Sequence, residues 1–316
     1  MALDQASEST RREYAARMNR VIDHIQKHLN DQLELEHLAA IACFSPFHFH
    51  RLFRAWIGET LHAFVHRLRL KRAAEELVFN RSKSITAIAL DCGFSGSSFF
   101  ARAFKEAFGV SATAWKNRTI CQTNRNLGEV SGDPVPRLSE PPGQTAWNKE
   151  IPFMNFPIEI KVRRLAPATI AYLRHVGPYM GDFRLFQRLF GQLFAWAGPR
   201  GLLHPESSYL SLFNDNPNLT AAAKHMLEMA LIVPPDTAAD GEIGVKTMDG
   251  GLCAIGRCRV LAAEYAKPWD ALVGDWLPGS GYQPDHRPAL EFYRNDPATD
   301  PEGKFELEVC LPVKPL

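Results

Sequence analysis

The sequence predicts a multidomain protein: an all-α N-terminal domain with two helix-turn-helix units, then an α+β domain. In the second domain, duplicated βαβ-type units are expected to form an antiparallel sheet with two helices on one face. Two internal repeats, with shifts of 51 and 80 residues, support this prediction. Between them the composition changes, because residues 119–157 are rich in proline and glycine and lack apolar periodicity. We therefore expect domains at 12–118 and 158–316, joined by a linker at 119–157.

Composition and charge indicate a cytoplasmic globular protein. Of its 316 residues, 46% are hydrophobic and 22% charged. No apolar run reaches the ~18 residues of a membrane span, and the polar N-terminus does not resemble a signal peptide. The six cysteines lack zinc-site spacing, so reduced structural thiols are expected. Residues 1–124 hold 17 Lys and Arg against 12 Asp and Glu, which leaves 19 against 23 for the remainder. A basic half followed by an acidic half is compatible with a phosphate-binding N-terminal domain.

The second helix-turn-helix unit lies at Ile85–Val110. Apolar residues recur at helical spacing before Gly93, which suits a turn with positive φ. After the turn, one face of a second helix is apolar and predicted to be buried, and it carries Phe100, Ala103, Phe104, Ala107 and Phe108. Ser98, Arg102 and Lys105 fall on the opposite face. This shape suits a DNA major groove, although a solvated helical hairpin has the same pattern.

The first unit, Leu33–Gly58, repeats this pattern. Ser45-Pro46 predicts a helix start, and the expected buried stripe is Phe49, Leu52, Phe53, Trp56 and Ile57. A shift of 51 residues places Arg51 on Arg102 and Arg54 on Lys105. Between the units, Thr60–Phe79 reads as one helix of roughly 30 Å. That length is close to the ~34 Å of one duplex turn, so two successive major grooves could be reached.

Residues from about 17 to 118 resemble the DNA-binding domain of the AraC/XylS transcription regulators. The resemblance rests on LAAIACFSPFHFHRLFRAWIG, HRLRLKRAAEEL and ITAIALDCGFSGSSFFARAFKEAFG. It implies double-stranded DNA as a partner, with outward residues of both second helices reading bases and phosphates. With the two basic positions of the repeat, the candidate DNA-binding residues are Phe47, His48, His50, Arg51, Arg54, Ser97, Ser98, Arg102 and Lys105. One departure is Ala112, where the family usually has proline.

Each outward residue also has a structural interpretation. Arg51 and Arg102 could be solvated charges, and His48 and His50 could pack against the neighbouring helix. A metal site from Cys43, His48 and His50 lacks a fourth ligand of suitable spacing, so neither a metal nor a cofactor is expected. The second helix of the first helix-turn-helix unit carries the larger outward side chains, so we expect it to supply most of the discrimination between bases. Its twin, with Ser97 and Ala101, is expected mainly to hold the DNA backbone.

The second repeat predicts two units of strand, strand, helix, strand, strand. SYLSLFNDNP at 208–217 aligns with PALEFYRNDP at 288–297, and the helices are expected at about Gly181–Ala197 and Leu261–Trp276. In the third strands, alternation predicts that Leu290 and Phe292 face the helices. Ser211 and Glu291 would then occupy equivalent positions on the other face, among aromatic rings. A carboxylate there suits a flat cation, but a solvated acid on an open sheet remains an alternative.

Nearly the whole of 158–316 resembles the GyrI-like effector-binding domain, through AYLRHVGPY, GDWLPGSGY and PALEFYRNDP. The resemblance implies a small-molecule effector and places Glu291 in its cleft. The candidate effector-binding residues are Glu291, Tyr293, Trp276, Tyr282, Phe213 and Tyr209. The protein is thus expected to be a transcription regulator that senses a small cationic or amphiphilic molecule, and not an enzyme. RNA polymerase is expected as a further partner, and no membrane association is expected. The alternative is a hydrolase in which Glu291 acts as general base beside Tyr293.

Overall fold

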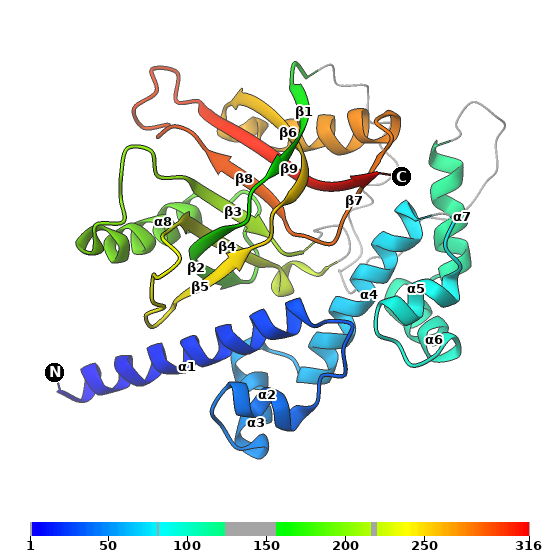
Figure 1. The fold of residues 1–316 in the computed structure, drawn as a ribbon, viewed down its shortest axis with the longest axis horizontal. Coiled ribbons are helices and arrows are strands. Elements are labelled where there is room, and N and C mark those ends of the chain that lie inside the picture. Colours follow the sequence, from blue (N-terminus) through cyan, green and yellow to red (C-terminus); the bar gives the residue numbers. More distant parts are fainter. Residues whose placement is uncertain (1, 81, 124–155, 216–219, 316) are drawn as a thin grey trace. The chain divides into compact units, whose positions relative to one another are not determined.

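The structure, a computed structural model, describes residues 2–80, 82–123, 156–215 and 220–315. These residues form two compact units that separate near residue 150, the first helical and the second built on a sheet (Figure 1). Most of the predicted linker, including Pro134, Pro136, Pro141, Pro142 and Pro152, lies outside the described residues.

The N-terminal unit repeats one helix-turn-helix. The 12-residue helices α3 and α6 start 51 positions apart, which confirms the predicted repeat. The turn before α6 contains Gly93 with φ of 81°, as predicted, and the equivalent turn has Cys43 with φ of 54°. The helices are α1 (Ala2–Lys27), α2 (Leu35–Ile41), α3 (Pro46–Ile57), α4 (Leu61–Phe79), α5 (Ile85–Asp91), α6 (Ser97–Phe108) and α7 (Ala112–Thr123).

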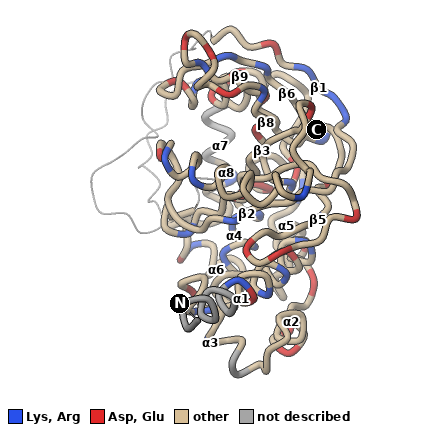
Figure 2. The backbone as a smooth tube through the Cα atoms, turned by 90° about the vertical axis from the view of Figure 1, so that its left-hand side faces the viewer, with Lys and Arg blue, Asp and Glu red and all other residues tan. Residues whose placement is uncertain are grey.

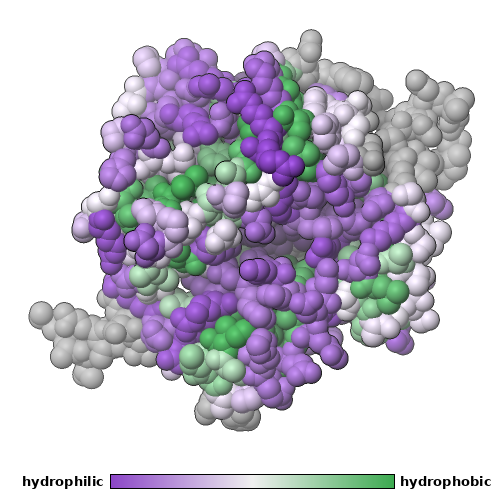
Figure 3. Space-filling view, in the orientation of Figure 1, coloured by the Kyte–Doolittle hydropathy of each residue, from purple (hydrophilic) through white to green (hydrophobic). Residues whose placement is uncertain are grey.

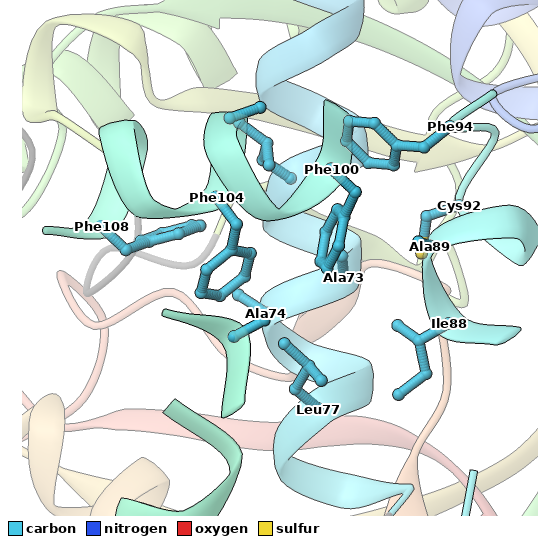
Figure 4. Close-up of a cluster of buried hydrophobic side chains, with 13 residues drawn as sticks. Ala73, Ala74, Leu77, Ile88, Ala89, Cys92, Phe94, Phe100, Phe104 and Phe108 are labelled. Carbon is cyan, nitrogen blue, oxygen red and sulfur yellow. The ribbon is translucent and has the colours of Figure 1, made fainter. Parts of the chain in front are cut away.

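Helix α4 joins the two helix-turn-helix units, as predicted. It begins after Thr60, whose hydroxyl accepts a hydrogen bond from the Ala63 amide at 3.2 Å. Its 19 residues correspond to about 28 Å. One part of α4 packs into the core of the second helix-turn-helix unit, where Ala73, Ala74 and Leu77 meet Phe100, Phe104 and Phe108 (Figure 4). Near its start, the ring of Phe64 lies 5.4 Å from that of Phe53 on α3. Both units therefore share α4 as a core element.

One residue of the predicted stripe on α3 is misplaced. Phe49, Phe53 and Ile57 are buried as expected, but the side chain of Trp56 is 40% exposed. A stripe that includes positions i, i+3, i+4, i+7 and i+8 is broad, and α3 is covered on only part of that arc. Trp56 lies at its edge.

The C-terminal unit is a nine-stranded antiparallel sheet in the part of the chain that the structure describes. Its main order is β1-β6-β9-β8-β3-β4-β2-β5, with β7 paired to β9. The two repeats of this sheet exchange their edge strands. Strand β1 of the first repeat pairs with β6 of the second, and β5 of the second repeat pairs with β2 of the first. The strands are β1 (Glu159–Leu165), β2 (Ala168–Val176), β3 (Tyr209–Phe213), β4 (Met226–Ile232), β5 (Ile243–Met248), β6 (Gly251–Val260), β7 (Tyr282–Pro284), β8 (Ala289–Tyr293) and β9 (Phe305–Pro315).

The two predicted helices differ in regularity. The first, α8 (Phe183–Ala197), is a regular helix capped by the side chain of Asp182. The sequence predicted a single second helix at about Leu261–Trp276, but the structure has several short helical segments there. They are a 3-10 turn at Ala262–Glu264, a short α9 (Ala266–Trp269), a π-helical segment at Asp270–Trp276 and a 3-10 turn at Leu277–Gly279. Single π turns within helices often occur at functional sites.

The helices cover the opposite face of the sheet from the one predicted. Leu185, Leu189 and Leu193 of α8 pack on the face that holds Met229 and Phe213. Ser211 and Glu291 belong to this helix-covered face. The prediction for Leu290 and Phe292 was therefore wrong, because they lie in the second cluster with Leu210 and Leu212. The alternation was correct, but central strands are buried on both sides, so hydrophobicity cannot tell which side the helices cover.

The second face also holds a buried ionic cluster. Glu228 on β4 is fully buried, and Arg174 Nη2 lies 2.6 Å from its Oε1. Lys246 Nζ lies 2.8 Å from Oε2 of the same carboxylate. Both cations also lie over the ring of Tyr172, at 4.9 and 4.6 Å from its centroid. Burial raises the pKa of Glu228, but the charges of Lys246 and Arg174 outweigh it and lower that pKa to about 2.

The face of the protein drawn in Figure 3 is largely hydrophilic where it is coloured. Figure 3 shows hydrophobic side chains in scattered patches on the visible face. The edge strand β1 carries Lys161, Arg163 and Arg164 (blue in Figure 2), and charges on an edge discourage pairing with other chains. Among the described residues, no helix is long and apolar enough to cross a membrane. The cysteines of known state are free thiols, Cys43 exposed and the others buried, namely Cys92, Cys253, Cys258 and Cys310.

Candidate DNA interface and ligand site

Helices α3 and α6 expose polar and basic side chains opposite their buried faces. Arg51 and Arg54 on α3 are exposed, and so are Arg102 and Lys105 on α6. His50 is exposed, so its packing interpretation is not needed. Phe47 and His48 belong to α3, but their side chains lie outside the described part of the structure. The described residues contain no His, Cys, Asp and Glu grouping that could hold a metal ion.

The arginines of α4 serve a different purpose from those of α3 and α6. Arg67 donates two hydrogen bonds to the buried Glu59, and Arg69 donates to the carbonyls of Leu29 and Asp31. These side chains hold the domain together. In contrast, Arg102 and Lys105 have no ion-pair partner among the described residues. Exposed cations without a partner in the protein are available for phosphates and base edges.

The first turn of α6 is open. Its N-cap residue is Gly96, which has no side chain to satisfy the first amides of the helix. Ser97 and Ser98 follow and are exposed. Amides and hydroxyls at a helix start are suitable donors to a phosphate group, next to the cations further along the helix. The candidate DNA residues with described side chains thus lie on exposed positions of two equivalent helices.

A buried carboxyl group lies at the centre of the C-terminal unit. Glu291 on β8 pairs in register with Ser211 on β3, where the two repeats meet. Only 3% of Glu291 is exposed, which excludes the alternative of a solvated acid. Its Oε1 accepts a hydrogen bond from Trp269 Nε1 at 2.6 Å, and its Oε2 lies 3.1 Å from the hydroxyl of Tyr293. That hydroxyl is 2.7 Å from Ser211 Oγ.

In the part of the chain that the structure describes, no cation lies beside the carboxyl group of Glu291. Burial raises its pKa to about 7, although the hydrogen bonds from Trp269 and Tyr293 act in the opposite direction. Among the described residues, no lysine or arginine contributes to this pKa. Glu228 shows the contrast within one sheet, since its two cations lower the pKa. Glu291 therefore has an unmatched capacity for a positive charge.

Aromatic rings surround this carboxyl group. Phe213 and Tyr209 lie on β3, and Phe213 is 6.2 Å from the ring of Trp269. The ring of Tyr293 meets Phe190 of α8 at 5.3 Å. Trp276 and Tyr282, predicted as walls of the site, stack on each other at 6.2 Å, and their role in the site stays a prediction.

Trp269 is the residue that sequence reasoning missed. It ends α9 and donates the shortest hydrogen bond to Glu291. A regular helix over Leu261–Trp276 would place Trp269 and Trp276 on one side, because they are seven residues apart. That spacing was the available signal, but the helical pattern drew attention to Trp276 alone.

A row of aromatic rings connects this site to the surface. Tyr265 meets Phe305 at 5.1 Å, and Phe305 meets Phe183 at 5.8 Å. Tyr265 and Tyr293 pack against the same small cluster. Phe183 is 45% exposed and its neighbour Met180 68% exposed. An apolar ligand therefore has an apolar surface beside the site on which to land.

Comparison with known proteins assigns both units. Residues 158–314 match the family model of the GyrI-like small molecule binding domain, and residues 38–118 match that of a helix-turn-helix domain. A DNA gyrase inhibitor of Edwardsiella piscicida is 33% identical over 162 residues, 50% of this chain and 99% of the relative. The regulatory protein PocR of Salmonella typhimurium is 33% identical over 103 residues, 33% of this chain and 34% of the relative. The crystal structure of the EcmrR C-terminal domain shares 15% identity at a TM-score of 0.44, covering 51% of this chain and all of that domain.

The helical unit with its repeated AraC-type helix-turn-helix and the sheet unit with its buried carboxyl group are thus each matched separately. A helix-turn-helix domain binds DNA, and a GyrI-like domain binds a small molecule. The chain belongs to the AraC-type transcription regulators with a C-terminal GyrI-like domain: it is a DNA-binding regulator that senses a small molecule.

Proposed function

We propose that this regulator reads DNA with α3 and α6 and responds to a small apolar organic cation held by Glu291. The observation that carries the second part is a carboxyl group 3% exposed, among aromatic rings and without a cation in the described protein. Aromatic faces attract cations, and a carboxylate supplies the counter-charge. Domains at 12–118 and 158–316 with a linker between them suit this division of tasks.

The proposed mechanism is a shift between arrangements of the regulator. A ligand changes an equilibrium only if it binds one state better than another. Trp269 is a suitable sensor, because its hydrogen bond to Glu291 must change when a cation takes that carboxylate. The α9 segment that carries Trp269 is irregular, so its conformation can change at lower cost than that of α8.

Arginine removal tests the DNA-reading assignment. Arg51→Ala and Arg102→Ala are each expected to lower operator affinity by about 1–3 kcal/mol if the guanidinium contacts a base edge. Fluorescence anisotropy at fixed salt measures the loss. Arg188→Ala on the exposed surface of α8 removes the same charge and serves as the control. Unchanged affinity in both DNA-domain variants would contradict the assignment.

Base-pair substitution tests the division of labour between the helices. We propose that α3, with Arg51 and Arg54, discriminates bases, whereas α6 mainly holds the backbone through Ser97, Ser98 and Lys105. Substitutions in the half-site under α3 should then cost more, about 1–3 kcal/mol per base pair. Equal sensitivity in both half-sites would contradict this division.

Neutralising Glu291 tests the ligand class. Glu291→Gln keeps the shape of the side chain but removes its charge. We expect the substitution to weaken the binding of tetraphenylphosphonium by at least about tenfold at about pH 8. Triphenylphosphine oxide, a neutral compound of similar shape, should lose much less. Titration calorimetry gives both affinities, and Glu302→Gln on the exposed surface is the control. Equal losses for the two compounds would rule out the counter-charge.

We further propose that the chain is a receptor without catalytic activity and that it works with RNA polymerase. Tyr293 beside Glu291 also suits a general base and its partner, so a hydrolase is the competing function. Incubation with aryl esters distinguishes them: turnover that disappears in Glu291→Gln would favour the hydrolase. In vitro transcription with purified polymerase, with and without tetraphenylphosphonium, tests the regulatory partner.

A further inference from the structure

Glu291 ends a chain of hydrogen bonds that crosses from one repeat to the other. Its Oε2 lies 3.1 Å from the Tyr293 hydroxyl, which is 2.7 Å from Ser211 Oγ. Ser211 is fully buried, and its Oγ lies 3.2 Å from Sδ of Met229 on β4. The carboxyl group of Glu291 and the hydroxyl groups of Tyr293 and Ser211 thus form a row that ends at the sulfur atom of Met229. Each hydroxyl group has one exchangeable proton, and the carboxyl group has one or none.

The direction of this chain depends on whether Glu291 carries a proton. A thioether sulfur accepts but cannot donate, so the contact with Met229 uses the proton of Ser211. Ser211 Oγ then accepts from Tyr293, whose only proton is thereby used. The oxygen of Tyr293 must in turn accept from the O–H of a protonated Glu291. In this direction every hydroxyl in the chain is satisfied and the carboxyl group is neutral.

The opposite direction suits an ionised Glu291. Tyr293 then donates to the carboxylate, Ser211 donates to Tyr293, and only the weak contact with Met229 is lost. No heavy atom has to move, because each hydroxyl only rotates. The same side chains therefore satisfy both charge states of Glu291.

We propose that Ser211 and Tyr293 form a reversible hydrogen-bond relay that lets the site take an organic cation in exchange for the carboxyl proton of Glu291. This inference rests on the proposed cation site and adds how the site is kept neutral when empty. The balance is simple: one cation enters, the O–H bond of Glu291 breaks, and one proton leaves to the solvent. Ser211 and Tyr293 are thereby specificity-determining residues, since a neutral ligand gains nothing from the exchange.

The groups around Glu291 leave the proton to this carboxyl group. The neighbours that act electrostatically with it are Cys258 on β6, Cys310 on β9, Tyr265 before α9, Tyr179 after β2 and its own neighbour Tyr293. Burial raises the pKa of every one of them, so they stay neutral near pH 7. Asp270 follows Trp269 on the covering segment, where burial and Asp275 raise its pKa. From α8, the ring of Phe190 contacts that of Tyr293.

The ligand-free protein provides the first test. Infrared spectra of the full chain at about pH 6 should contain the carbonyl band of a protonated carboxyl group that disappears as the pH rises through about 7. The band should be missing in Glu291→Gln. Ser211→Ala should lower the midpoint by about one pH unit, because Tyr293 then donates only to Glu291. Ser208→Ala, just before β3, is the matched control. A spectrum without a Glu291-dependent band at about pH 6 would overturn the relay.

Calorimetry with tetraphenylphosphonium, which cannot itself titrate, provides the second test. At about pH 6, binding enthalpies in two buffers of different ionisation enthalpy should show close to one proton released per cation. Affinity should rise about tenfold per pH unit up to about 7 and then level off. Ser211→Ala should release fewer protons at about pH 6. Binding without proton release would overturn the exchange but leave cation sensing intact, whereas no binding at all would overturn both.

Discussion

Glu228→Ala is expected to destabilise the C-terminal unit by about 3–5 kcal/mol. The substitution leaves the guanidinium of Arg174 and the ammonium of Lys246 without their shared carboxylate, and the side chain of Arg174 is 4% exposed. An uncompensated buried charge costs several kcal/mol, because neither water nor another anion replaces the lost partner. Thermal unfolding followed by circular dichroism or calorimetry of the full chain measures the loss.

Glu306→Ala is the matched control for this variant. Glu306 lies on β9 of the same sheet and pairs with Arg257, whose side chain is 64% exposed. A solvent-exposed pair contributes about 0–1 kcal/mol. If both variants lost the same stability, the cluster around Glu228 would have no special weight in the fold.

The pH dependence of this effect has a definite sign. The pKa of Glu228 falls from 4.5 to about 2 on folding, so the folded state holds its proton less tightly than the unfolded state. The stabilisation is fully present above about pH 4.5 and is lost as the pH falls towards about 2. The stability difference between wild type and Glu228→Ala should shrink over that interval.

The helix-turn-helix architecture was predictable because its signals are local. Gly93 at a turn and the repeated stripes on α3 and α6 each specify geometry within a dozen residues. The shift of 51 residues aligned the two helix-turn-helix units, so the pattern of the second unit predicted the fold of the first. Trp56 escaped because the width of a buried arc depends on which elements cover the helix, and that is a tertiary property.

The sheet was harder to predict from its own residues. The repeat correctly placed Ser211 and Glu291 at equivalent positions on one face of the sheet. Strand alternation alone does not show which face the helices cover, so the helices were assigned to the wrong face. Glu228 stands within an apolar run, and nothing near it in sequence announces Arg174 or Lys246, which lie on other strands. Trp269 depends on a helix that departs from regular geometry. These features arise from pairing between distant strands, which a single sequence records only weakly.

Phe104→Ala is expected to destabilise the N-terminal unit by about 3–5 kcal/mol. Phe104 is fully buried, and its ring contacts Phe100 at 5.4 Å, Phe108 at 4.5 Å and Trp115 at 5.7 Å. Removing the ring leaves a cavity between α4, α6 and α7 that a close-packed core cannot fill. Thermal unfolding measures the loss of stability, and anisotropy with operator DNA measures the loss of binding.

The same helix supplies the control. Phe99→Ala removes an identical side chain that is 41% exposed, so it should cost far less stability. Because α4 packs on α6 through Ala73, Ala74 and Leu77 and on α3 through Phe64, the damage in Phe104→Ala should spread. Hydrogen exchange should show faster exchange in α4 as well as in α6, with no such change in Phe99→Ala. If exchange rose in α6 alone, the two helix-turn-helix units would be independent, and α4 would space them without coupling their stability.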